Sequence, residues 1–85
     1  MRIIETDDFL DSLSRLPKDI QVFYLRQKKI FVTDPRDSRL HTKKLKDLAL
    51  VFSFRITRNY RVLFYFQTET IAVFFDIDHR KDVYR

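Results

Sequence analysis

Three runs of alternating apolar and polar residues dominate the second half of the chain. They cover residues 52–57, 61–66 and 71–77 and are rich in phenylalanine, isoleucine and valine. Alternation with a period of two in such residues is typical of half-buried β-strands, and the short connections favour hairpins. Residues 52–85 are therefore expected to form three consecutive antiparallel strands followed by a short basic tail.

The alternation also predicts how these strands pair. A two-residue loop at residues 68–69 places Phe66 opposite Ile71 and gathers apolar side chains on one face. In the first hairpin, a three-residue loop over residues 58–60 keeps both faces consistent, and a bulge is the alternative. Asn59 is the loop residue expected to tolerate a positive φ. The face predicted to pack against the core consists of Phe52, Phe54, Ile56, Val62, Phe64, Phe66, Ile71, Val73, Phe75 and Ile77.

The other face of the predicted sheet is polar. The same register places Arg61 opposite Asp76, so Arg61 has two interpretations, a phosphate clamp or a structural ion pair. Two arginines, a histidine and a tyrosine are expected to converge there, which makes this face a candidate phosphate site. The residues expected on this face, or just after its last strand, are Ser53, Arg55, Thr57, Arg61, Tyr65, Asp76, His79, Arg80 and Tyr84.

The N-terminal part of the chain predicts a strand and a first helix. Residues 1–4 form a short β-type run. Thr6 can cap the helix that follows, and Asp7 and Asp8 are favourable in its first turn. Four apolar side chains then fall on one helical face, namely Phe9, Leu10, Leu13 and Leu16.

A second helix is predicted from Lys18 to about Thr33. Pro17 fits its first position, and Asp34-Pro35 ends it. Its apolar stripe favours packing of a helical hairpin on the sheet. The basic connection over residues 34–47 is expected to be pinned to the body by Leu40 and Leu45. The chain is thus predicted to be one α+β domain over residues 1–85, with a strand, a helical hairpin and a three-stranded antiparallel meander.

Composition narrows the possible functions. The net charge is +5, and residues 36–61 hold eight bases against two acids. Such segregation suits a polyanion or an acidic partner, although a solvated basic surface is the alternative. There are no cysteines and only two histidines, so a disulfide or a metal site is not expected. No apolar run resembles a membrane span or a signal peptide, which favours the cytoplasm. Glycine is absent, so turns must rely on Asn, Asp and Pro.

The order of these elements resembles the RelE/ParE superfamily of bacterial toxins. The likeness is carried by LHTKKLKDLALVFSFRITRNYRVLFYF at residues 40–66 and by DIDHRKDVYR at residues 76–85. The first segment is similar to the family's middle hairpin, and the second is similar to its C-terminal signature. Asp47 and Asp78 stand where the family commonly has glycine. The resemblance implies a RelE-like β-α-α-β-β-β fold.

The resemblance also implies a function. RelE-like members are ribosome-dependent endoribonucleases that cut mRNA without metal or other cofactor, and a cognate antitoxin holds them inactive in a hetero-oligomer. ParE-like members share the fold but inhibit DNA gyrase, and an inactive member that only binds antitoxin or RNA is a third possibility. The implied catalytic residues are Arg55, Arg61, His79 and Tyr84, and the implied RNA-binding residues are Lys43, Lys44, Lys46, Arg58 and Arg80. His41 is a lesser candidate for acid/base work.

Overall fold

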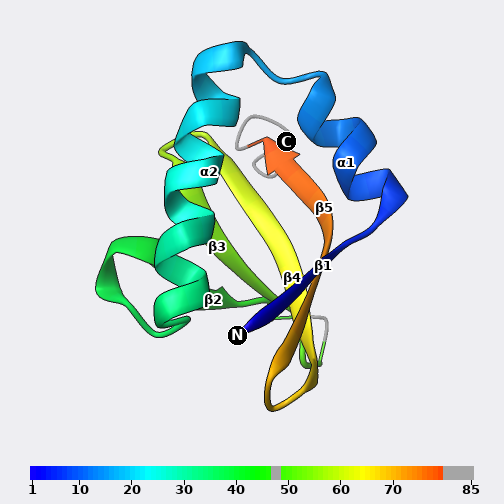
Figure 1. Cartoon of the computed structure of the whole chain (residues 1–85), viewed down its shortest axis with the longest axis vertical. Helices are drawn as coiled ribbons and strands as arrows, with labels where there is room; N and C mark the ends of the chain where they lie inside the picture. Colours follow the sequence, from blue (N-terminus) through cyan, green and yellow to red (C-terminus); the bar gives the residue numbers. More distant parts are fainter. Residues whose placement is uncertain (47–48, 80–85) are drawn as a thin grey trace.

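In the computed structural model, which describes residues 1–46 and 49–79, five strands form one sheet and two helices pack on one of its faces (Figure 1). The spatial order of the strands is β1-β5-β4-β3-β2; β1 runs parallel to β5, and the other pairs are antiparallel. The elements are β1 (Arg2–Glu5), α1 (Asp7–Ser14), α2 (Lys18–Thr33), the 3-10 helix η1 (Ser38–Leu40), β2 (Lys43–Lys44), β3 (Phe52–Thr57), β4 (Tyr60–Thr68) and β5 (Ile71–His79). The predicted α+β fold is confirmed, with the short strand β2 as an addition.

The helices begin and end close to the predicted positions. Thr6 is the N-cap of α1, where its side-chain oxygen accepts a hydrogen bond from the backbone N–H of Phe9 at 3.1 Å. Pro17 is the N-cap of α2 and not its first helical residue, one position away from the prediction, and Asp34 ends the helix as predicted. None of the described helices is long and apolar enough to cross a membrane.

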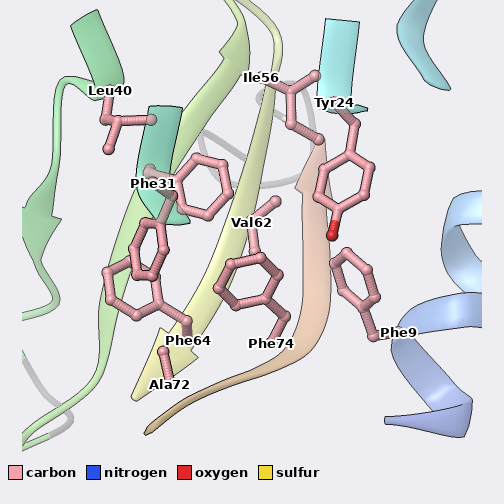
Figure 2. Close-up of a cluster of buried hydrophobic side chains, with 10 residues drawn as sticks. Phe9, Tyr24, Phe31, Leu40, Ile56, Val62, Phe64, Ala72 and Phe74 are labelled. Atoms are coloured by element: carbon pink, nitrogen blue, oxygen red, sulfur yellow. The ribbon is translucent and has the colours of Figure 1, made fainter. Parts of the chain in front are cut away.

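The core lies between the helices and one face of the sheet. Its centre is the ring of Phe31 from α2, whose centroid lies 5.3 Å from Phe54, 5.0 Å from Phe64 and 5.1 Å from Phe74 (Figure 2). Phe9 brings α1 into the same cluster through an edge contact with Phe74 at 5.8 Å. Aromatic rings at these separations fill the space between helices and sheet. The face of the sheet turned away from the helices is called the second face below.

The second hairpin differs from the predicted register. Its loop is residues 69–70, which pairs Thr68 with Ile71, and irregularities follow next to Phe66 and Leu63. The first irregularity turns residues 72–74 to the other face of the sheet, and the second restores the predicted alternation from Asp76 onwards. The predicted core positions Val73 and Phe75 therefore lie on the second face, and the core instead receives Ala72 and Phe74. Of the other residues predicted for the core, Phe54, Ile56, Val62 and Phe64 are buried in it, Phe52 and Ile77 pack at its margin, Ile71 is half-buried and Phe66 is exposed.

The first hairpin contains the bulge that was the alternative to a three-residue loop. Its loop is the two residues 58–59, and the register shifts between Arg55 and Thr57, so the predicted loop was wrong and the bulge is confirmed. The Nε2 group of Gln27 donates to the carbonyl oxygen of Arg55 at 2.7 Å, beside this bulge. The bulge thus exposes a carbonyl that α2 satisfies.

Left-handed backbone occurs away from the predicted position. Asn59 does not have a positive φ; among the described residues His41 (φ 46°) and Leu50 (φ 66°) do. Because the chain has no glycine, side-chain-bearing residues occupy both positions. His41 ends η1, next to the site described below.

Candidate functional site

The guanidinium of Arg61 is held on the second face of the sheet. Its Nε donates to the hydroxyl oxygen of Ser53 at 2.8 Å, and its Nη2 donates to the carbonyl oxygen of Ser53 at 3.3 Å. Nη2 also donates to the carbonyl oxygen of His41. Arg61 therefore reaches from β4 across β3 to the segment that follows η1, and one edge of its guanidinium has a defined position.

Arg55 lies directly opposite Arg61. The two are paired across β3 and β4, and residues paired in an antiparallel ladder lie on the same face. Like charges in this arrangement repel one another unless an anion comes between them. The buried Nε of Arg55 has no hydrogen-bond partner among the described residues. The two cations therefore lie at one place on the sheet, where Asp78 is the residue opposite Arg61 on β5.

A cleft of about 570 Å³ adjoins Arg55 between α2, η1 and β3. Its lining combines apolar and basic residues and contains no carboxylate among the described residues. A volume of this size is typical of small-ligand sites, roughly 300–1,000 Å³. The lining residues are Phe23, Arg26, Gln27, Ile30, Arg39, His41, Arg55, Ile56 and Thr57.

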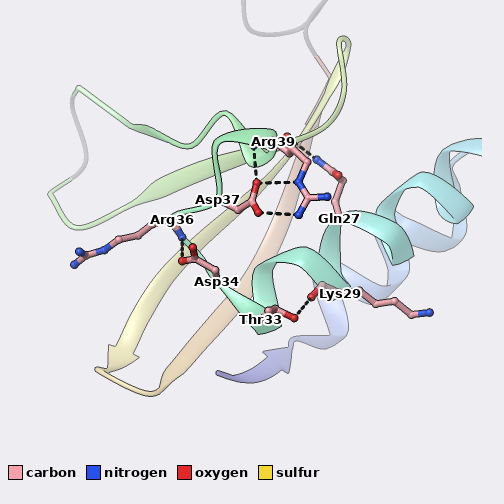
Figure 3. Close-up of polar contacts among 7 residues, drawn as sticks. All are labelled: Gln27, Lys29, Thr33, Asp34, Arg36, Asp37 and Arg39. Atoms are coloured by element: carbon pink, nitrogen blue, oxygen red, sulfur yellow. Dashed lines mark hydrogen bonds and ion pairs between the residues drawn. The ribbon is translucent and has the colours of Figure 1, made fainter.

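The rim of this cleft is organised by the turn before η1. Asp37 caps η1 and accepts hydrogen bonds from the side chain of Arg39 at 3.0 and 2.8 Å (Figure 3). These bonds, then the backbone N–H of Arg39, lower the pKa of Asp37 to about 2, and Asp37 in turn raises the pKa of Arg39. Gln27 donates to the carbonyl oxygen of Arg39 as well as to that of Arg55. A single side chain of α2 thereby connects both walls of the cleft.

The predicted lysines and the turn arginine are distributed over several surfaces. Lys43 pairs with Ser53 and lies on the second face with Arg61, whereas Lys44 pairs with Phe52 and lies on the helix-covered side. Lys46 and Arg58 are exposed. Of these predicted RNA-binding residues, only Lys43 shares a strand-ladder face with the two arginines.

His79 does not converge with Arg61. It pairs with Tyr60, and their rings stack at 4.6 Å with an interplanar angle of 24°. Tyr60 packs against the core, so the ring of His79 lies at the margin of the helix-covered face. The predicted convergence on one face was wrong for this residue.

The predicted pairing of Arg61 with Asp76 is also wrong. The turn lies one residue later than predicted, at residues 69–70, and the two irregularities in the ladder offset each other, so that Asp78 lies opposite Arg61. Asp76 instead accepts a hydrogen bond from the hydroxyl of Ser12 at 3.4 Å. The predicted site residues Arg80 and Tyr84 lie outside the described residues.

Three contributors to this site were not predicted as such from the sequence. Ser53 was expected on this face but not as a ligand of Arg61, and Gln27 was not singled out from the sequence. His41 contributes a backbone carbonyl, which no side-chain pattern reveals. The available signal in the sequence was Ser53, a polar residue between two phenylalanines of a predicted strand. In the structure only 3% of the surface of Ser53 is exposed. Buried hydroxyls almost always have a partner.

Solved structures of bacterial and archaeal toxins share this fold over nearly the whole chain. The toxin–antitoxin complex RelBE2 from Mycobacterium tuberculosis is 28% identical, with a TM-score of 0.75 over 93% of this chain and 96% of that chain. The archaeal RelE–RelB complex from Pyrococcus horikoshii is 18% identical, with a TM-score of 0.76 over 93% of both chains. The YoeB/ParE toxin from Agrobacterium tumefaciens is 17% identical, with a TM-score of 0.76 over 93% of this chain and 98% of that one.

The sequence matches no protein-family model, and no curated protein matches it significantly. The structural likeness nevertheless confirms the predicted resemblance to the RelE/ParE superfamily of toxins. The order of strand, helical hairpin and meander is the same as in these toxins, and the second face of the sheet carries the arginine pair.

Proposed function

We propose that this protein is the toxin of a type II toxin–antitoxin system and acts as a ribosome-dependent endoribonuclease on mRNA. Its likeness to RelE and YoeB/ParE toxins supports the toxin role. The observation that carries the nuclease activity is the Arg61 guanidinium, fixed by Ser53 and His41 and opposite Arg55. Two guanidinium groups on one surface suit a phosphate whose negative charge grows in the transition state.

The proposed reaction is an attack of the ribose 2′-oxygen on the adjacent phosphorus. The new O–P bond forms as the bond from phosphorus to the 5′-oxygen breaks, which leaves a 2′,3′-cyclic phosphate and a 5′-hydroxyl. A base takes the proton of the 2′-hydroxyl, and an acid gives a proton to the leaving 5′-oxygen. Arg61 clamps the phosphate and Arg55 stabilises its added charge. This route uses no metal or other cofactor.

The proposed candidates for the two proton transfers are His79, Tyr84 and His41. Histidine is the residue type that most often serves in general acid–base catalysis. His79 lies at the margin of the other face, so it meets a bound nucleotide only around the end of the sheet. His41 adjoins Arg61 through its carbonyl and lines the cleft with Arg55. His41 is therefore a stronger candidate for acid–base catalysis than the sequence alone indicates.

The basic surface around this site is proposed to hold the mRNA backbone and the ribosome. Lys43 extends the arginine pair along the second face, and the exposed side chains of the other basic residues add sequence-independent attraction for phosphate. The proposed contacts are Lys43, Lys44, Lys46, Arg58 and Arg80. An acidic cognate antitoxin would mask this surface in a cytoplasmic hetero-oligomer, with residues 1–85 acting as one toxin domain.

Inhibition of DNA gyrase is the second candidate function. The position of His79 favours this function, because a histidine beside the arginines would mildly disfavour a pure binder, and the ring of His79 lies on the other side of the sheet. A ParE-like protein would use the same basic surface without breaking a bond. The fold is common to both activities and does not separate them.

The test is cleavage of a defined mRNA by the purified protein, with and without programmed ribosomes. The proposal predicts cuts within the codon at the A site, only when ribosomes are present, with a 2′,3′-cyclic phosphate end. A supercoiling assay with purified gyrase runs in parallel. Intact mRNA together with inhibited gyrase would replace the nuclease proposal with the second candidate, and intact mRNA with active gyrase would leave an inactive binder of antitoxin.

A further inference from the structure

We infer that Ser53 is a positioning residue for Arg61, and this inference rests on the nuclease proposed above. Ser53 has only 3% of its surface exposed, and its partner across the ladder is the buried side chain of Leu63. A hydroxyl in such surroundings is destabilising unless it is hydrogen-bonded. The Nε of Arg61 supplies that bond at 2.8 Å. An alanine side chain would fit the same space without requiring a hydrogen bond. The buried hydroxyl of Ser53 does require a partner, and Arg61 is that partner.

Ser53 holds Arg61 at two atoms. Its hydroxyl oxygen accepts from Nε, and its carbonyl oxygen accepts from Nη2 at 3.3 Å. With the His41 carbonyl, three acceptors define the plane and direction of the guanidinium. All three of these acceptors are neutral, and Asp78 lies opposite Arg61 across the ladder. Because the Arg61 side chain is already fixed before the substrate binds, less of its conformational entropy is lost when the phosphate is bound.

The backbone on both sides of this contact is itself fixed. Ser53 lies within β3 and is paired with Lys43 on one side and Leu63 on the other. His41 adopts left-handed φ and ψ of 46° and 48°, and its N–H donates to the carbonyl oxygen of Ser38 at 3.2 Å. A non-glycine residue in this conformation needs its surroundings to hold it there. Of the three acceptors, only the Ser53 hydroxyl is removable by mutation without changing the backbone.

The first test is the rate of ribosome-dependent cleavage under single-turnover conditions. Ser53→Ala is expected to lower the maximal rate about 10- to 100-fold, since a hydrogen bond to a charged group is lost, while the concentration giving half-maximal rate changes little. Ser53→Thr retains the hydroxyl and is expected to recover most of the rate. Ser14→Ala, an exposed serine at the end of α1, is the matched control and is expected to cleave like the wild type.

A double-mutant cycle separates positioning from a general loss of structure. If Ser53 acts through Arg61, Ser53→Ala will cause no further loss of rate in an Arg61→Lys background. A loss equal to that in the wild-type background would overturn the inference, because the serine would then act independently of the arginine.

A spectroscopic test does not depend on nuclease activity. In the 15N-labelled full chain, the Nε–Hε signal of Arg61, assigned by its loss in Arg61→Lys, is expected to shift and to exchange faster with water in Ser53→Ala. An unchanged signal would refute the positioning of Arg61 by Ser53 even if the protein cleaves mRNA. A changed signal in a protein without nuclease activity would retain the positioning and reject the proposed function, so the two failures are distinguishable.

Discussion

At the scale of single residues, Arg61 and Tyr24 are both held in place by a few polar contacts beside an aromatic core. Tyr24 is fully buried, and its hydroxyl donates to the carboxylate of Glu5, whose other oxygen pairs with Lys28 at 3.2 Å. Burial first, and then the hydrogen bond and charge of Glu5, raise the pKa of Tyr24 far above its ordinary value. Through this tyrosine, the free energy of unfolding is expected to depend on pH in the alkaline range.

Tyr24→Phe is expected to change the pH dependence of unfolding. The folded-state pKa of Tyr24 is raised, so its contribution is complete below the unfolded pKa of about 10 and is lost as pH rises above that value. Between pH 7 and 9 the variant should be less stable by about 1.5–3 kcal/mol, from the lost bond to a charged acceptor. Above pH 10 this difference should shrink by up to about 1.4 kcal/mol per pH unit.

Urea unfolding of both proteins at pH 8, 9, 10 and 11 measures this difference. Tyr65→Phe is the matched control, because Tyr65 is 38% exposed and should give the same stability as the wild type throughout. A constant difference between wild type and Tyr24→Phe across the whole range would contradict the raised pKa.

The sequence predicts some residues of the site and misses others for identifiable reasons. Arg55 and Arg61 were predicted to share a face and do so, because a two-residue loop with a one-residue bulge gives the same alternation as the predicted three-residue loop. His79 was misplaced because β5 continues through it, and its alternation puts His79 on the same side of the sheet as Ile77. Asp76 stays on the second face but pairs with Leu63, because the turn lies one residue later than predicted. Hydrogen bonds to backbone carbonyls, such as the one from Arg61 to His41, leave no trace in residue spacing.

At the scale of elements, the start of α1 depends on one capping contact. Thr6→Ala removes the oxygen that accepts from the Phe9 N–H and is expected to lower the free energy of unfolding by about 1 kcal/mol. Thr33→Ala, an exposed threonine in the last turn of α2, is the control and should cost less than about 0.5 kcal/mol. Chemical denaturation measures both; equal losses in the two variants would show that Thr6 does not cap the helix.

Helix limits were more predictable than strand registers. The signals that begin and end α1 and α2, namely Thr6, Pro17 and Asp34, lie at the ends themselves. The bulge in β3, by contrast, is accompanied by a hydrogen bond from Gln27 on α2, a contact that only the tertiary fold creates. Strand β2 has exposed lysines and no apolar alternation, so its pairing with β3 was not predicted.

At the scale of the whole molecule, Phe31 joins the second helix to the centre of the sheet. Phe31→Ala is expected to reduce the free energy of unfolding by about 3–5 kcal/mol, through lost burial and the cavity left among the surrounding rings. Phe23→Ala on the same helix removes a ring that is 43% exposed and should cost far less. Urea unfolding distinguishes them, and similar losses for both would contradict this assignment of the core.

We propose that the Arg61 face of the sheet cleaves mRNA on the ribosome. The most direct measurement is primer extension on a cellular mRNA after brief induction of the wild type, of Arg61→Ala and of Arg15→Ala. Arg15 is a control of the same type, with 77% of its side chain exposed and paired only with Asp11 among the salt bridges of the described residues. Cuts inside translated codons should appear with the wild type and Arg15→Ala and be absent with Arg61→Ala. Equal cutting by Arg61→Ala, at equal protein levels, would contradict the account.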